Sequence, residues 1–167
     1  MSGRKRPDTP LRTMRIRRAR NDDTAAIREV VDSAYAQYVE RMGKPPAPML
    51  ADYESLVTAG DVWIGDDEEL VIGVLVMRPS GEALELENVA VSPSHQGHGY
   101  GRALIDFAER RARELGLPAV TLYTNEAMVE NLRLYARLGF VETERRVEDG
   151  YRRVFFRKAL DARELPR

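Results

Sequence analysis

A glycine-rich loop separates an apolar strand pattern from an amphipathic helix pattern in the stretch VAVSPSHQGHGYGRALIDFAERRARELG, residues 89–116. A second short, β-branched strand pattern, AVTLYT, begins directly after this helix at residue 119. Two strands that are joined through a helix lie parallel in one sheet, and the connection between them is right-handed. The stretch therefore predicts a fold of the α/β class, built around one parallel strand pair.

The other segments add mostly antiparallel strands around this unit. Strand patterns occur at MRIRRA from residue 14, VWIG (62–65), LVIGVLVMR (70–78), ALELENVAV (83–91), FVETERRV (140–147) and YRRVFFRKAL (151–160). Helical spacing predicts a helix after the capping residues Asn21, Asp22 and Asp23, and others at roughly 50–59, 100–115 and 127–138. We expect one α/β (α+β) domain with about four helices and a mixed, mostly antiparallel sheet of six to seven strands.

Length and composition narrow the class of protein. A chain of 167 residues suffices for one domain with a hydrophobic core. Its net charge of −1 gives no overall attraction to nucleic acid or anionic membranes, and no segment reaches the ~18 apolar residues of a membrane span. The absence of cysteine excludes disulfides and thiolate metal sites. We expect a cytoplasmic domain over residues 14–167 after a flexible basic tail over residues 1–13, with no nucleic-acid or membrane partner.

The glycine loop has the composition of an anion site. A helix start presents unpaired N–H groups, the glycines at 97, 99 and 101 let an anion approach them, and Arg102 adds a cation. The GxxxxGK[ST] loop is absent, and the dinucleotide fingerprint GxGxxG fails because Arg102 replaces its third glycine. A tight strand-to-helix turn is the alternative. His95 and His98 lack a third nearby ligand, so we expect no metal.

One further pattern fits the loop. The motif Gln96-x-x-Gly99-x-Gly101, preceded by VAVSP, and the segment TLYTNEAMVENLRLYARLGF (121–140) both resemble the GNAT superfamily of N-acetyltransferases. The resemblance covers roughly residues 84–160. It implies an acetyl-CoA-dependent N-acetyltransferase whose sheet splays between its fourth and fifth strands.

The resemblance implies a set of cofactor contacts. The pyrophosphate of acetyl-CoA would meet the loop, and its pantetheine arm would pair with the backbone of the preceding strand, as an added strand does. The residues concerned are Val89, Ala90, Val91, Gln96, Gly97, His98, Gly99, Tyr100, Gly101 and Arg102. Asn125, Asn131 and Tyr135 would add contacts from the following strand and helix. Asn125 as a helix cap and Asn131 as a solvated surface residue are the alternatives.

The resemblance also implies how acetyl transfer proceeds. Tyr135 would be the general acid that protonates the departing thiolate, and a backbone N–H near Val91 would stabilise the oxyanion. Glu85 and Glu87 are in phase with Val91 on one strand, so either could reach the cleft and act as a base through water. The alternatives are a core position for Tyr135 and the wet side of a half-exposed strand for both glutamates.

The acceptor is the least determined part of the site. Tyr35, Tyr38 and Arg41, with the GKPPAPM loop (43–49), would wall a site for a small-molecule amine or a peptide. The tyrosines follow helical spacing, so a place in the core is the alternative for them. Protein N-terminal or lysine acetylation, a non-catalytic acetyl-CoA sensor and a mononucleotide-binding protein stay open, as does a homodimer.

Overall fold

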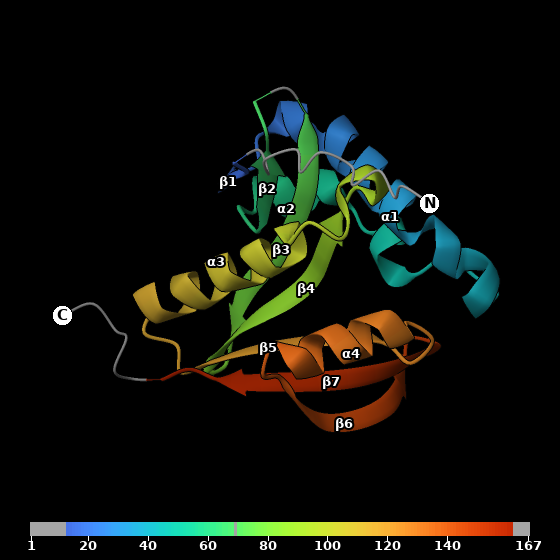
Figure 1. The fold of residues 1–167 in the computed structure, drawn as a ribbon, viewed down its shortest axis with the longest axis vertical. Helices are drawn as coiled ribbons and strands as arrows, with labels where there is room; N and C mark the ends of the chain where they lie inside the picture. The colour runs from blue at the N-terminus through green and yellow to red at the C-terminus, as the bar shows by residue number, and fades with distance from the viewer. Residues whose placement is uncertain (1–12, 69, 162–167) are drawn as a thin grey trace, which may run out of the picture.

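The structure, a computed structural model, describes residues 13–68 and 70–161. Within these residues a seven-stranded sheet has the order β1-β2-β3-β4-β5-β7-β6, and only the β4–β5 pair is parallel (Figure 1). The strands are β1 (Arg15–Arg18), β2 (Val62–Asp66), β3 (Val71–Ser80), β4 (Ala83–Val91), β5 (Ala119–Asn125), β6 (Val141–Glu148) and β7 (Tyr151–Ala159). The α-helices are α1 (Thr24–Met42), α2 (Tyr53–Thr58), α3 (Tyr100–Glu114) and α4 (Val129–Arg137). The predicted fold class is confirmed.

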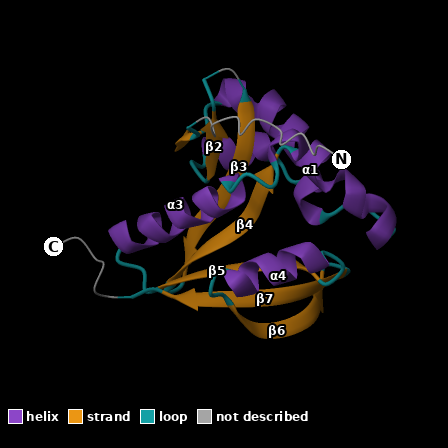
Figure 2. Ribbon diagram, viewed as in Figure 1, coloured by secondary structure: helices purple, strands orange, loops and turns teal. Residues whose placement is uncertain are grey.

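Two hydrophobic clusters lie on opposite faces of the sheet. Val74 and Val76 of β3 pack with α1 and α2, whereas the intervening Leu75 and Met77 pack with α3 and α4. Successive side chains of a strand point to opposite faces, so one strand contributes to both clusters. Figure 2 shows the helices that cover these faces. Residues of β4 alternate too, but with one shift of phase: Leu84 and Leu86 belong to the second cluster, and so do Val89 and Val91, whereas Ala90 belongs to the first.

The sheet opens between β4 and β5. Their parallel pairing starts at Ala83 opposite Ala119 and ends at Leu86 opposite Leu122. The next residue of β4, Glu87, is the extra residue of a β-bulge, because Val76 pairs with Asn88 and Met77 pairs with Leu86. A bulge bends the strand that carries it, so β4 turns away from β5 where the pairing ends (Figure 1). The expected splay between the fourth and fifth strands is confirmed.

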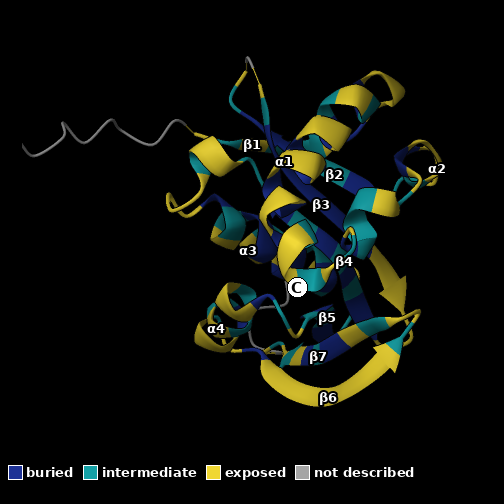
Figure 3. Cartoon of the chain, turned by 90° about the vertical axis from the view of Figure 1, so that its right-hand side faces the viewer, coloured by how far each residue is buried: buried dark blue, intermediate teal, exposed yellow. Residues whose placement is uncertain are grey.

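Some local expectations were wrong in detail. Asn21–Asp23 form a 3-10 turn before α1, and the Asp23 carboxylate accepts hydrogen bonds from Arg17 and from the Arg20 backbone instead of capping α1. The second helix starts at Tyr53, after a separate 3-10 turn, η2 (Ala47–Leu50). β6 is exposed along its length at the sheet edge (Figure 3). Except for Thr13, the expected tail lies outside the described residues. No described helix is long and apolar enough to cross a membrane.

Candidate active site

The glycine loop connects the end of β4 to the start of α3, which has no side-chain cap. Gly97 and Gly99 have left-handed backbones, with φ of 80° and 83°. Added Cβ atoms would meet nothing within 4 Å, so the left-handed backbone rather than crowding calls for glycine there. No side chain caps α3, which leaves its first N–H groups for an anion. The Gln96 amide donates a 3.0 Å hydrogen bond to the Val91 carbonyl, which fastens the loop to the strand.

In β4, the backbone N–H and C=O groups of every second residue point into the opening. Ser92 N donates to Ile72 O of β3 at 2.8 Å, so by the alternation of an antiparallel ladder Val91 and Val89 point their N–H and C=O groups away from β3. Two contacts agree with this orientation, because the Val91 carbonyl accepts from Gln96 and the Val89 carbonyl lies 3.3 Å from the Tyr35 hydroxyl. The free edge of β4 therefore faces the opening.

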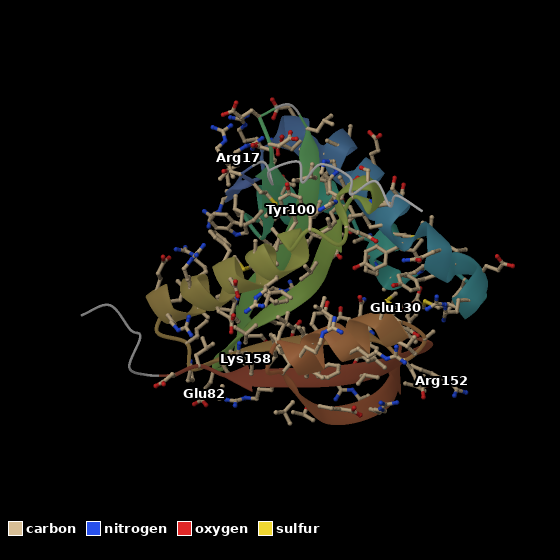
Figure 4. All side chains as sticks on the ribbon, viewed as in Figure 1. Arg17, Glu82, Tyr100, Glu130, Arg152 and Lys158 are labelled. Carbon is tan, nitrogen blue, oxygen red and sulfur yellow. The ribbon has the colours of Figure 1, made fainter. Side chains whose placement is uncertain are left out.

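A groove runs along this edge between α1, α3 and α4, with a volume of about 460 Å³. Most of the predicted cofactor residues line it. They are Val89, Ala90, Val91, Gln96, Gly97, Gly99, Tyr100, Gly101, Arg102, Asn131 and Tyr135. His95 also lines the groove, but His98 does not, and its exposed ring lies 6.5 Å from that of Tyr100. Figure 4 shows Tyr100 on α3 and Glu130 on α4, two of the three helices that border the groove.

A second, smaller pocket of about 50 Å³ occupies the splay itself. Leu86 and Leu122, the last paired residues of β4 and β5, lie at its inner end. The pocket and the groove share four wall residues, Tyr35, Val89, Asn131 and Tyr135. The two hollows thus meet beside Tyr135.

Tyr135 is buried among aromatic rings. Phe140 and Phe156 both lie 5.9 Å from its ring centre. Burial, with a contribution from Tyr38, raises the pKa of Tyr135 to about 12. The phenol is therefore protonated at neutral pH and has a proton to donate.

The tyrosines of α1 have structural partners. The Tyr35 hydroxyl donates to Asn88 Oδ1 at 2.6 Å, and Asn88 Nδ2 donates to the Tyr53 hydroxyl at 3.0 Å. Tyr35 still lines both hollows, whereas Tyr38 lines only the cofactor-side groove. Arg41 points elsewhere, because its guanidinium donates to Glu130 and to the Ala127 carbonyl of the α4 end. Of the three predicted acceptor residues, the structure brings Tyr35 alone to the pocket in the splay.

The two candidate bases lie in different surroundings. Glu87 lines the pocket and forms an ion pair with Arg78, whose side chain is about half exposed. Glu85 lies before the bulge and lines neither hollow. Its neighbours Leu84 and Leu86 pack in the same cluster as Val91, so Glu85 faces the opposite side and its expected phase with Val91 was wrong. Burial, and then the neighbouring Glu87, raise the pKa of Glu85. Position therefore favours Glu87 over Glu85 as a group that could reach an acceptor.

Other residues of the pocket carried no signal in the sequence analysis. Tyr123 of β5 and Tyr151 and Arg153 of β7 line it. Asn125, a predicted cofactor residue, also lines this pocket and does not line the groove. The alternation of β5 could have indicated Tyr123, since it follows the last paired residue. Asn125 Oδ1 accepts from Ala127 N at 2.9 Å, which closes a turn before α4. Asn125 does not cap this helix, because Met128 occupies the N-cap position. The described residues hold no cluster of three metal-ligating side chains.

Comparisons with known proteins agree with this geometry. Residues 25–140 match the sequence model of the Acetyltransferase (GNAT) family. An amino-acid acetyltransferase of Mycobacterium tuberculosis is 30% identical over 133 residues, which cover 77% of this chain and 69% of the relative.

Two solved structures share the fold. A putative acetyltransferase of the GNAT family from Desulfovibrio desulfuricans matches with a TM-score of 0.72 and 21% identity, over 88% of this chain and 99% of that one. The putative acetyltransferase yncA from Salmonella typhimurium, solved with its cofactor acetyl-CoA, matches with a TM-score of 0.67 and 24% identity, over 93% and 98%.

Proposed function

Because the chain belongs to the acetyltransferase (GNAT) family, we propose that it moves an acetyl group from acetyl-CoA to a primary amine by direct attack in a ternary complex. One observation carries the proposal: a long groove and a small pocket meet beside Tyr135. Two substrates bound in these hollows would bring their reacting ends together at this residue. Holding two reactants in such a geometry makes attack effectively unimolecular.

The groove offers the donors that acetyl-CoA requires. The uncapped start of α3 and the loop residues from Gln96 to Arg102 would bind the pyrophosphate. The outward-facing backbone groups of Val89 and Val91 would pair with the amides of the pantetheine arm, as an added strand pairs with a sheet edge. The same edge supplies a backbone N–H for the oxyanion that forms when the amine attacks the thioester.

Two side chains would handle the protons. An alkylammonium with a pKa near ~10.4 is protonated at neutral pH, so Glu87, acting through water, would help to remove a proton from the acceptor. The Tyr135 hydroxyl would then protonate the thiolate of the leaving coenzyme A. Asn131 lies one helical turn before Tyr135, so both face the junction of the two hollows.

Acetyl-CoA binding tests this proposal, and the two ends of α3 provide a matched pair of variants. Gly99 and Gly116 both have left-handed backbones with open space around a Cβ, but only Gly99 lines the groove. In a thermal-shift titration, acetyl-CoA should stabilise the wild type and Gly116→Glu, whereas Gly99→Glu should lose the shift. NAD and ATP should not stabilise the protein. A folded wild type that saturating acetyl-CoA fails to stabilise would overturn the proposal.

A further inference from the structure

The pocket in the splay has an apolar side chamber. The chamber adjoins the pocket at Ala47, Pro48, Glu87, Asn88 and Tyr123, which line both. Beyond this junction its walls are Ala51, Tyr53, Leu56 and Val76. A molecule whose polar end lies at Glu87 would therefore place its remaining body against rings and aliphatic groups. Such walls stabilise an apolar body by removing its surface from water.

A short segment forms one part of the pocket wall. Residues 43–48, which we call the strap, connect the end of α1 to η2 and contribute Pro46, Ala47 and Pro48 to the wall. Lys44 Nζ donates to the Gly150 carbonyl at 2.6 Å, and the Tyr151 hydroxyl donates to the Pro45 carbonyl at 2.7 Å. The strap is thus fastened to the β6–β7 turn on the other side of the opening. A pocket of about 50 Å³ with a wall held in this way suits a small molecule better than a polypeptide chain.

The charges around the pocket disfavour an acceptor that carries a carboxylate. Glu87 and Arg153 are the charged residues of its described wall. Arg153 already donates to Glu148 at 2.6 Å, lies 3.9 Å from Asp149, and stacks 4.4 Å above the Tyr123 ring. Its guanidinium is therefore compensated by carboxylates of the protein itself. A buried cation with such partners has little remaining need for a carboxylate from a ligand.

The pKa of Tyr123 depends on the same charged groups. Burial raises the pKa of Tyr123, Arg153 opposes the rise, and Glu87, Glu85 and Glu148 add to it. Glu148 is already paired with Arg153, so Glu87 and Glu85 are the carboxylates whose charge this guanidinium leaves uncompensated. Arg78, the partner of Glu87, is about half exposed, so solvent screens its charge more strongly. An ammonium group would be attracted to this region, and a carboxylate would be repelled.

We propose that the acceptor is a small primary amine on an apolar, preferably aromatic, body without a carboxylate next to the amino group. This inference rests on the proposed acetyltransferase function and names its substrate class. The amino group would lie between Glu87 and Tyr135, and the body would lie against Tyr123 and extend into the side chamber. The class excludes free α-amino acids and peptide chains as preferred acceptors.

Matched acceptor pairs test the charge argument. Release of coenzyme A can be followed with a thiol reagent, because the protein has no cysteine of its own to react. The pairs are phenethylamine with phenylalanine and isoamylamine with leucine, in which the bodies are equal and only the carboxylate differs. The kcat/KM of each amine should exceed that of its amino acid by about tenfold or more, and a short peptide with a free N-terminus should be poor.

Variants of the chamber test the body of the acceptor. Tyr123→Leu should lower kcat/KM for phenethylamine more than for isoamylamine, whereas Tyr123→Phe, which keeps the ring, should preserve the preference. Ala51→Phe narrows the side chamber and should discriminate against the longer bodies while acetyl-CoA still stabilises the variant. Preservation of the wild-type preference by Tyr123→Leu and Ala51→Phe would count against the proposed binding mode.

The outcomes separate this inference from the function on which it rests. Equal or faster turnover of amino acids or of the peptide overturns the acceptor class and leaves the acetyltransferase function in place. Turnover of no amine by a protein that acetyl-CoA stabilises overturns both, and it identifies a binding module instead. Faster turnover of the apolar amines alone supports both.

Discussion

The Tyr35 hydroxyl on α1 donates a 2.6 Å hydrogen bond to the buried Asn88 side chain on β4, 53 positions away in the sequence. Asn88 Nδ2 in turn donates to the hydroxyl of Tyr53 in α2, and this hydroxyl donates to the Pro48 carbonyl at 2.5 Å. One chain of hydrogen bonds thus joins α1, the bent part of β4, α2 and the strap. Because Asn88 follows the bulge directly, this chain fixes the wall of the pocket where β4 leaves β5.

The first prediction concerns this connection. Tyr35→Phe leaves the buried Asn88 oxygen without its donor, which should lower the free energy of unfolding by about 1–3 kcal/mol. Denaturant titration of Tyr35→Phe, Asn88→Ala and the double variant measures the coupling. The losses should be clearly less than additive, because either change alone already removes the bond. Strict additivity would show that the two side chains are energetically independent.

The second prediction concerns the acid. Tyr135→Phe should keep the affinity for acetyl-CoA and lower kcat by roughly 10²-fold or more, the contribution of a general acid. With a pKa of about 12, the wild-type phenol stays protonated through the alkaline range, so the protonation state of the acid causes no loss of rate there. We therefore expect kcat/KM to rise between about pH 7 and about pH 10 as the amine loses its proton. A fall of the rate within that range would contradict this assignment.

The third prediction separates the two glutamates. Glu87→Gln should lower kcat strongly with acetyl-CoA binding intact, because Glu87 lines the pocket. Glu85→Gln should change kcat little, because Glu85 lines neither hollow. Steady-state rates with one amine at several pH values distinguish them. A larger kcat loss in Glu85→Gln than in Glu87→Gln would reverse the assignment.

Glu85 should instead affect stability. Its folded-state pKa is raised above the value of 4.5, first by burial and then by Glu87. The folded state therefore holds this proton more tightly than the unfolded chain, and stability is lost as the pH rises through the folded-state pKa. Glu85→Gln should be more stable than the wild type at neutral pH, and the difference should vanish below the unfolded-state pKa. Unfolding curves at acidic and neutral pH check the sign.

Sequence patterns predicted those parts of the fold that depend on residues close together in the chain. The left-handed glycines and the start of α3 follow from backbone and side-chain preferences of neighbouring residues. The alternation of β4 was predicted without the shift that the bulge at Glu87 introduces. The motif around Gln96 also indicated most of the groove. These features need no knowledge of what lies across the sheet.

The acceptor pocket could not be predicted in the same way. Its wall combines β4, the strap and β7, and the bond from Tyr151 to Pro45 spans 106 positions. Tyr151 and Arg153 stand in an ordinary strand pattern, and only the pairing of β7 with β5 brings them to the opening. Arg41 was predicted to lie at the acceptor site, but its guanidinium at the end of α1 donates to Glu130 on α4 instead. Such choices depend on long-range contacts that spacing along the chain does not encode.

The bulge at Glu87 makes the opening depend on a single surplus residue. Deleting Ala90 or Val91 would let β4 and β3 align without interruption, and Asn88 and Val89 would then move one position along β3 and exchange faces. The backbone groups of Val89, which now point towards the opening, would then pair with β3. Chain length in this short segment is therefore under tighter constraint than side-chain identity, and substitutions there should be tolerated far more readily than insertions or deletions.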